Sequence, residues 1–244
     1  MSPGWVEVHR EWPDESDFPK DTDRDTVNGE PEVRFTLSYD GPLPSCTQRA
    51  KRGTEKQALR REFNHQLAQV WKTEPVLSSL LKHYDEFEDA LLNKEMSRLY
   101  RPKSPKKPAR YGVRFGLGGF RFVPLITAQN NLWCELDVVL YRNGDPGHIL
   151  AKNGADLDSN LKLIFDGLRM PQTSDELAGD KPTSQDDPFF CVLEDDRLIT
   201  RLTIDTKRRI LRSDESPNQS DVLVTIGVNV IARKLTETNR GLLV

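Results

Sequence analysis

Apolar and polar positions alternate along several segments of the chain, and this alternation predicts β-strands. Residues 132–141 alternate between an apolar set that begins at Leu132 and a more polar set that begins at Trp133, as in a half-buried strand. Further runs predict strands at residues 33–39, 189–193, 198–204 and 222–231. Glycines between aromatic residues predict a β-hairpin within residues 111–126. We expect these strands to form one mixed β-sheet.

Apolar residues at helical spacing predict three helices. The first runs from about residue 47 to residue 72, and the second follows Pro75 to about residue 91. The third runs over residues 156–168, where an apolar stripe is formed by Leu161, Ile164, Phe165 and Leu168. Strands and helices in this order predict an α/β (α+β) fold, in which helices pack on the mixed sheet.

The polar residues of the third helix point to metal chemistry. Asp156 and Asp158 stand at its start, where free backbone N–H groups favour carboxylates, and Lys162 and Asp166 continue along its polar flank. An acidic cluster, Glu194-Asp195-Asp196, follows a later apolar run. Mg²⁺ prefers oxygen ligands and typically takes one or two carboxylates together with waters and phosphate oxygens. The alternative interpretation is a helix cap with an Asp-to-Lys surface pair, which stabilises by only about 0.2–0.5 kcal/mol.

At these residues the sequence resembles the RusA-type Holliday junction resolvases, a family of crossover junction endodeoxyribonucleases. That family carries a D-x-D-N-x-x-K-x-x-x-D-x-L helix, followed by a strand that ends in an acidic pair. The match covers Asp156, Asp158, Lys162, Phe165, Asp166 and Leu168, and then Asp195-Asp196 with Leu198-Ile199 after it. A weaker similarity is the proline-rich turn at residues 41–45, after the first strand.

The sequence also departs from the pattern of that family. Ser159 stands where the family usually has Asn, although Asn160 comes next. Residues 171–188 form a polar, proline-containing insertion between the helix and the acidic pair, and the second helix belongs to a further insertion near residues 75–110. The resemblance therefore supports the fold and the metal chemistry more strongly than it supports specificity for DNA junctions.

The resemblance implies a RusA-like fold and a metal-dependent endonuclease that cuts branched DNA such as Holliday junctions as a homodimer. The metal-binding carboxylates would be those of Asp156, Asp158 and Asp196, with Asp195 close by. The ion would be Mg²⁺, with Mn²⁺ as an alternative. Lys162 would join the catalytic set by steadying the scissile phosphate or orienting the attacking water.

Composition limits the classes of protein to which the chain can belong. The chain has 244 residues, of which 30% are charged, and it has no apolar run near the roughly 18 residues of a membrane span. Its N-terminus shows no basic stretch followed by an apolar one, so we expect a cytoplasmic protein without a secretion signal. Cys46, Cys134 and Cys191 are too scattered for a zinc site or a disulfide framework. Cys134 and Cys191 lie in apolar runs, where we expect buried free thiols.

Charge is distributed unevenly along the chain. Residues 1–32 hold ten acidic and three basic side chains, which predicts a flexible acidic arm before a nuclease domain at residues 33–244. Without this arm, which contributes −7, the formal net charge changes from −3 to +4. The acidic balance of the whole chain therefore does not exclude a nucleic-acid partner.

Basic residues gather in three groups. The first lies between residues 97 and 121, the second at residues 49–61 (with Lys56, Arg60 and Arg61) and the third at residues 207–212. Phosphate backbones are bound chiefly by such groups, whereas a single group is as often only a solvated face. The residues that we predict to bind DNA are Arg49, Lys51, Arg52, Arg101, Lys103, Lys106 and Lys107.

Two other function classes remain open from the sequence. One is a non-catalytic nucleic-acid-binding protein on the same fold. The other is a phosphatase similar to the haloacid dehalogenases, but that class needs a buried strand before its D-x-D, and residues 152–155 are no such strand. Glu135 and Asp137 share one face of a predicted strand, either as accessory metal ligands or, as we favour, as solvent-facing carboxylates.

Overall fold

The strands form two sheets, not the single sheet predicted from the sequence. The computed structural model describes residues 33–43, 49–78, 115–143, 157–211, 221–233 and 239. In the larger sheet the strand order is β1-β7-β4-β6, and in the smaller it is β2-β3-β5. The bounds are Arg34–Pro42 for β1, Phe115–Leu117 for β2, Phe120–Ile126 for β3, Leu132–Arg142 for β4, Phe189–Leu193 for β5, Ile199–Arg208 for β6 and Asp221–Ala232 for β7.

Both sheets mix parallel and antiparallel pairs, and the fold class is α+β. In the larger sheet β7 pairs antiparallel with β1 and β4, whereas β4 and β6 run parallel. In the smaller sheet β2 and β3 form an antiparallel hairpin and β3 runs parallel to β5. Gly118 and Gly119 form the turn of this hairpin with φ of 59° and 89°, a conformation that glycine adopts without steric cost. The hairpin expected within residues 111–126 is therefore confirmed over residues 115–126.

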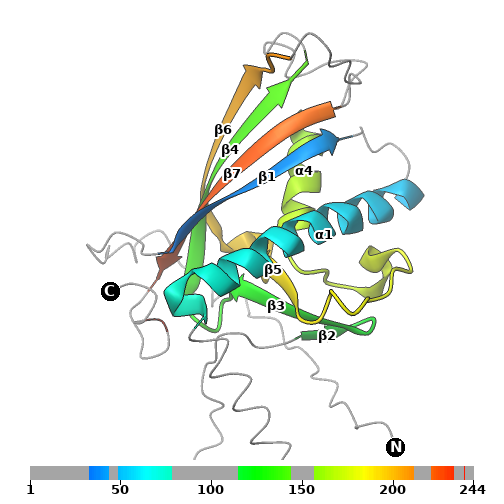
Figure 1. The fold of residues 1–244 in the computed structure, drawn as a ribbon, viewed down its shortest axis with the longest axis vertical. Coiled ribbons are helices and arrows are strands. Elements are labelled where there is room, and N and C mark those ends of the chain that lie inside the picture. Colours follow the sequence, from blue (N-terminus) through cyan, green and yellow to red (C-terminus); the bar gives the residue numbers. More distant parts are fainter. Residues whose placement is uncertain are drawn as a thin grey trace, which may run out of the picture.

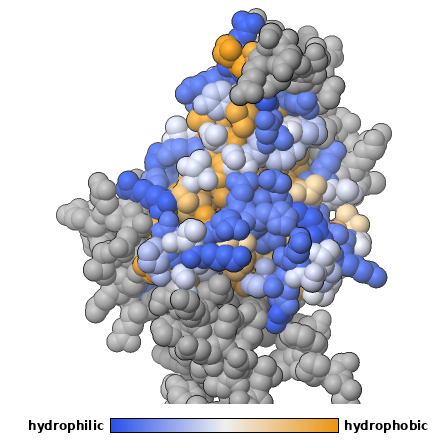
Figure 2. Space-filling view, in the orientation of Figure 1, coloured by the Kyte–Doolittle hydropathy of each residue, from blue (hydrophilic) through white to orange (hydrophobic). Residues whose placement is uncertain are grey.

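Helix α1, Arg49–Thr73, lies across one face of the larger sheet (Figure 1). Its predicted apolar stripe is confirmed, because Leu59, Phe63, Leu67 and Trp71 are all buried. On β4 and β7 alternate residues are buried against the same core, as their alternation predicted. The exposed side of the helix is polar, and hydrophilic residues cover most of the described part of the face drawn in Figure 2.

The smaller sheet is joined to α1 by apolar packing and by one buried hydrogen bond. The Asn64 side chain of α1 accepts a hydrogen bond of 2.7 Å from the backbone N–H of Phe190 in β5. The ring of Phe190 also stacks on Trp71, with 5.4 Å between the ring centroids. The opposite face of this sheet packs in a second apolar cluster that includes Phe120, Phe122 and Leu177. These contacts fix the strand that leads directly to the acidic cluster at residues 194–196.

Helix α4, Leu157–Leu168, confirms the third predicted helix, and Asp158 and Lys162 of its predicted polar flank are exposed. Ile164 and Leu168 are buried and Leu161 and Phe165 are partly buried, so the apolar stripe faces the core as expected. Asp166, however, was predicted to line an exposed flank and is only 7% exposed. It is buried because cationic side chains from α1 and from the end of α4 surround its carboxylate.

The insertion at residues 171–188 is an integral part of the fold. It contains a short 3₁₀ helix, η2 (Ser174–Leu177), and its Leu177 is buried against the second apolar cluster. Two arginines of α1 pair with acids of this segment: Arg60 with Glu176, and Arg61 with Asp180 and Asp186. This polar segment is therefore held in place, because its acids form ion pairs with arginines of α1.

The remaining sequence predictions concern the cysteines, the acidic arm, the second helix and membrane-spanning segments. Cys134 and Cys191 are buried free thiols, as predicted, and burial raises the pKa of each to about 12. The acidic arm at residues 1–32 and the second helix beyond residue 78 lie outside the described residues. No described helix has the length and apolar character needed to cross a membrane.

Replacing Gly167 by valine is expected to destabilise the fold by about 2 kcal/mol, because helices α1 and α4 approach closely at this glycine. A Cβ atom at this position would lie 2.9 Å from the Cγ and Cδ2 atoms of Leu59, which is itself buried. Urea unfolding of Gly167→Val and of the parent measures the loss. Gly116→Val is the control, since a Cβ there meets nothing within 4 Å, and equal stability of both variants would contradict the tight packing.

Candidate functional site

Asp158 and Lys162 lie on one exposed face of α4. Both side chains are exposed, and neither has a hydrogen bond or an ion pair with the part of the chain that the structure describes. The surface pair between them, which was the alternative interpretation of this spacing, is therefore not formed. At 3.6 residues per turn, Asp158, Lys162 and Phe165 fall within about 60° of one another around the helix axis. This face of α4 thus presents a carboxylate and an ammonium group that no described residue pairs, together with an aromatic ring.

The acidic cluster follows β5 and divides into residues with different roles. Asp195 precedes the short 3₁₀ helix η3, Asp196–Leu198, and its carboxylate accepts a 3.0 Å hydrogen bond from the backbone N–H of Arg197. The guanidinium of Arg197 also pairs with this carboxylate, at 2.9 Å. Partial burial acts to raise the pKa of Asp195, but the hydrogen bonds and charge of Arg197 lower it. Asp195 therefore already has a cationic partner and a capping role.

Asp196 has the opposite electrostatic environment. Partial burial raises the pKa of its carboxyl, and the neighbouring charge of Asp195 raises it further. Arg169 offsets part of this effect, whereas Asp166 adds to it. A carboxylate that its neighbours disfavour in the ionised form is a good candidate for a cation ligand, because a bound cation would relieve the repulsion.

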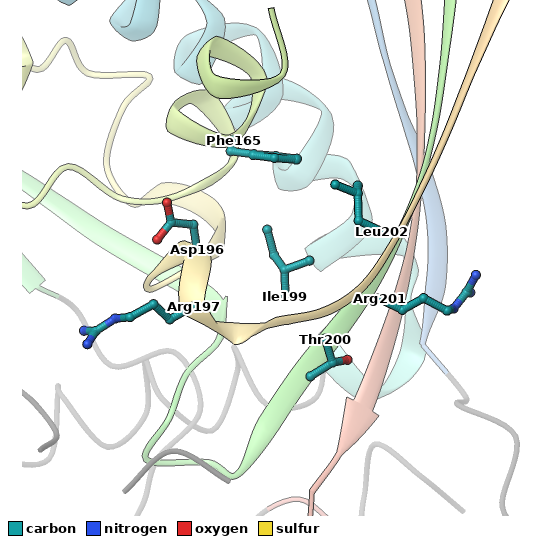
Figure 3. A pocket seen from close by; sticks show the side chains of 7 residues that line it. All are labelled: Phe165, Asp196, Arg197, Ile199, Thr200, Arg201 and Leu202. Atoms are coloured by element: carbon teal, nitrogen blue, oxygen red, sulfur yellow. The ribbon is translucent and has the colours of Figure 1, made fainter. Parts of the chain in front are cut away.

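A pocket of about 400 Å³ opens between α4 and β6, directly beside Asp196 (Figure 3). Phe165 of α4 and Ile199 and Leu202 of β6 surround its apolar part, and the Asp196 carboxylate lies at one side. Arg197 and Arg201 also belong to the lining, but their guanidinium groups point away from the pocket (Figure 3). The pocket is therefore apolar inside and carries a carboxylate at its edge.

A chain of alternating charges lies behind this pocket and was not predicted from the sequence. Asp166 pairs with Lys56 at 2.6 Å and with Arg169 at 2.5 Å. Arg169 pairs in turn with Glu176 at 3.1 Å, and Glu176 pairs with the buried Arg60 at 2.8 Å. Of these contacts, only the i,i+3 spacing of Asp166 and Arg169 is visible in the sequence. The chain links α1, α4 and the insertion, and so holds together the elements around Asp196.

The predicted metal ligands that the structure describes do not form one cluster. No group of three or more His, Cys, Asp or Glu side chains that could hold a metal ion is found among the described residues. Asp158 lies about 10 Å along the helix axis from Phe165, the α4 residue beside Asp196. Asp156 lies outside the described residues. Asp158 therefore does not line the pocket beside Asp196, and the two acids are not grouped at one site.

The predicted DNA-binding residues can be only partly placed. Helix α1 begins with Arg49, Lys51 and Arg52, whose side chains the structure does not describe. Residues 101–107 lie wholly outside the described residues. The other three basic residues of this group on α1 were not among the predicted DNA-binding residues. Lys56, Arg60 and Arg61 neutralise acids of α4 and the insertion. In the third basic group, Lys207 pairs with Asp205 and Arg209 pairs with Asp40.

Glu135 and Asp137 are strand carboxylates away from this site. They lie on the face of β4 opposite to the core and both pair with Arg201, at 2.7 Å and 3.2 Å. The favoured interpretation, in which they face solvent, is consistent with this placement, since neither lines the pocket beside Asp196.

Comparison with known proteins adds no family to this description. The chain matches no protein-family model, no curated protein and no solved structure. The function is therefore inferred from these residues and from the sequence motif.

Proposed function

We propose that this protein is a Mg²⁺-dependent, structure-selective endonuclease that cleaves branched DNA such as Holliday junctions, on a RusA-like fold. The observation that supports this most strongly is the face of α4 beside the pocket. It presents the exposed side chains of Asp158 and Lys162 on the helix whose Phe165 lines the pocket beside Asp196, and the pKa of Asp196 is raised by burial and by nearby acids. An acidic site that also carries an exposed lysine suits a phosphodiester substrate bound together with a cation.

The donor groups at this site fit a hard cation. Mg²⁺ needs only one or two carboxylates when phosphate oxygens and waters complete its shell. Asp196 would supply one at the pocket edge, and the motif carboxylates of Asp158 and Asp156 would supply others at a separate position. When bound, Mg²⁺ or Mn²⁺ supplies a water of lowered pKa and offsets charge at the phosphodiester. Lys162, one helical turn after Asp158, would bind a non-bridging oxygen of the scissile phosphate.

The sequence motif supports DNA as the substrate and a homodimer as the active form. A four-way junction has approximate two-fold symmetry, so a two-fold homodimer can present one site to each of two opposed strands. The three acids, the lysine and the acidic pair of the RusA pattern occur here in the same order, which is the basis for proposing this family. The phosphate contacts would come mainly from residues 97–114 and from the start of α1.

One structural observation favours a second candidate, a non-catalytic protein that binds branched nucleic acid. Asp195 is already paired with Arg197, and the helix places Asp158 about 10 Å along its axis from the residue beside Asp196. A protein that had lost its metal ligation would show such a separation. The two candidates share the DNA partner and differ only in cleavage.

A cleavage assay separates these candidates. The full-length protein is incubated with end-labelled four-way junction, flap, fork and linear duplex, in Mg²⁺, Mn²⁺, Ca²⁺ or a chelator, and binding is measured in parallel. Metal-dependent cleavage of the branched substrates, with little cleavage of linear duplex, supports the endonuclease. Selective binding of branched DNA without cleavage in either Mg²⁺ or Mn²⁺ supports the second candidate. Equal or absent binding to all four substrates would contradict both.

Neutralising Lys103, Lys106 and Lys107 together is expected to weaken DNA binding and flatten its dependence on salt. Each phosphate contact that is lost lowers the slope of log K against log salt by about 0.9 for duplex DNA. Titrations of the triple Lys→Gln variant at several salt concentrations measure the slope. The matched control neutralises the exposed Lys72, Lys181 and Lys207, which removes the same charge elsewhere. Equal slopes for the parent and the residue 103–107 variant would exclude this segment as a phosphate contact.

A further inference from the structure

The pocket between α4 and β6 exposes apolar surface that the fold leaves uncovered. Leu202 is 39% exposed, and among the described residues only Ile210 is another large hydrophobic side chain classed as exposed. Phe165 and Ile199 are only partly buried and line the same pocket. Three apolar side chains from two elements therefore converge on one open space (Figure 3). Such convergence is characteristic of a binding site more than of scattered surface residues.

The size and charge of this pocket restrict its occupant. A volume of about 400 Å³ lies at the lower end of the range for small-ligand pockets, which suits a single ring system more than a helix or a strand. The carboxylate of Asp196 at its edge disfavours an anionic group inside. Arg201 is held away from the pocket by Glu135 and Asp137, and Arg197 is held away by Asp195. The occupant that fits is therefore flat, uncharged and largely apolar on its faces.

We propose that this pocket receives one unpaired nucleobase of a branched DNA, with the ring of Phe165 as a stacking surface. The proposal rests on the proposed function, because a phosphate held beside Asp196 would place its own nucleotide at the pocket edge. Bases at a branch point are already partly unstacked, so displacing one from the duplex costs less than it does in linear DNA. Stacking on an aromatic side chain tolerates any base, because every base has a π-face. The pocket would thus select for branched structure without selecting for sequence.

The test measures a displaced base directly and does not depend on cleavage. Four-way junctions that carry 2-aminopurine at successive positions near the branch point are titrated with the full-length protein in Ca²⁺. Fluorescence of this base analogue rises when it is unstacked from its neighbours and changes again when it stacks on a protein ring. For the parent we expect a fluorescence change at one or two positions only.

Three pocket variants and one control variant assign that change to the pocket. Phe165→Leu keeps an apolar side chain but removes the stacking surface, and it should weaken junction binding about tenfold while leaving linear-duplex binding unchanged. Phe165→Tyr should retain junction affinity. Leu202→Ala, at an exposed position, tests the opposite wall with little effect on folding. Ile210→Ala is the control, since Ile210 is 85% exposed and does not line the pocket.

The outcomes separate a failure of this proposal from a failure of the proposed function. If the parent binds or cleaves junctions, but Phe165→Leu does so with unchanged affinity and an unchanged 2-aminopurine signal, the base pocket is refuted and the function stands. If no branched DNA binds the parent, the proposed function fails first. If Phe165→Leu and Leu202→Ala change the sedimentation of the protein without changing the fluorescence, the surface is a contact between protein chains and the proposal is overturned.

Discussion

Asp196→Asn is expected to abolish cleavage of branched DNA while leaving the fold and DNA binding intact. Asparagine keeps the shape of the side chain but removes the charge that would hold Mg²⁺. Loss of an outer-shell partner of a metal ligand typically costs about 10- to 100-fold in activity, so loss of a ligand itself should cost at least about 100-fold. Asp196 is exposed at the pocket edge, and its substitution removes a carboxylate that its neighbours already disfavour. The folded protein should therefore be no less stable.

Asp158→Asn should have the same effect if Asp158 and Asp196 both take part in metal binding. Single-turnover cleavage of a labelled four-way junction in Mg²⁺ gives the rates, and binding to the same junction in Ca²⁺ shows that the substrate still docks. Binding should be equal or tighter, because each variant removes a negative charge that repels phosphate. Asp205→Asn is the matched control, since Asp205 is an exposed carboxylate on β6 outside the pocket.

The pair of variants also reports on the separation of the two acids. If Asp196→Asn is inactive and Asp158→Asn cleaves at the parental rate, the metal is held near Asp196 alone and Asp158 is only a helix-start carboxylate. If Asp196→Asn retains the parental rate, the metal assignment is wrong. Loss of activity in both variants would instead mean that the two carboxylates act together on the bound DNA, in spite of their separation along α4.

The elements that sequence analysis predicted well are those whose pattern is local. The alternation in β4 and β7 and the stripe of α1 each depend on neighbours within a few positions, and the structure confirms all three. The division into two sheets was not predicted, because it depends on which strands pair. β1 and β7, which pair along their whole length, lie at opposite ends of the sequence. No local pattern specifies that choice.

The ion-pair partners of the charged residues could not be predicted for the same reason, because they depend on contacts between segments that are distant in the sequence. Arg60 and Arg61 were grouped with phosphate-binding residues because their neighbours in the sequence are basic, but their partners, Glu176, Asp180 and Asp186, lie more than a hundred residues later. Similarly, the motif identified Asp166 as a polar residue, but only the fold shows that it is buried between Lys56 and Arg169. A carboxylate or a cation in a sequence motif can serve chemistry or packing, and burial decides between them.

Removing the charge of Arg60 is expected to cause the largest loss of stability of any single ion-pair substitution in the described part of the chain. The side chain of Arg60 is fully buried, and its guanidinium donates to the carboxylate and backbone carbonyl of Glu176 and to the carbonyl of Arg169. Burial lowers the pKa of Arg60, although arginine stays charged in proteins. Breaking a buried pair by removing one partner typically costs about 3–5 kcal/mol, because the other charge is left uncompensated.

Arg60→Met, which approximately preserves the length of the side chain, is therefore expected to lower the free energy of unfolding by about 3 kcal/mol. Urea unfolding of the parent and the variant measures this loss. Lys207→Met is the matched control: its pair with Asp205 is about half exposed on both sides, and such surface pairs contribute at most about 1 kcal/mol. The double variant Arg60→Met/Glu176→Gln should recover part of the loss, because it removes the orphaned carboxylate. A loss for Arg60→Met no larger than that of the control would mean that solvent reaches this pair, and that the insertion is held to α1 by its apolar contacts alone.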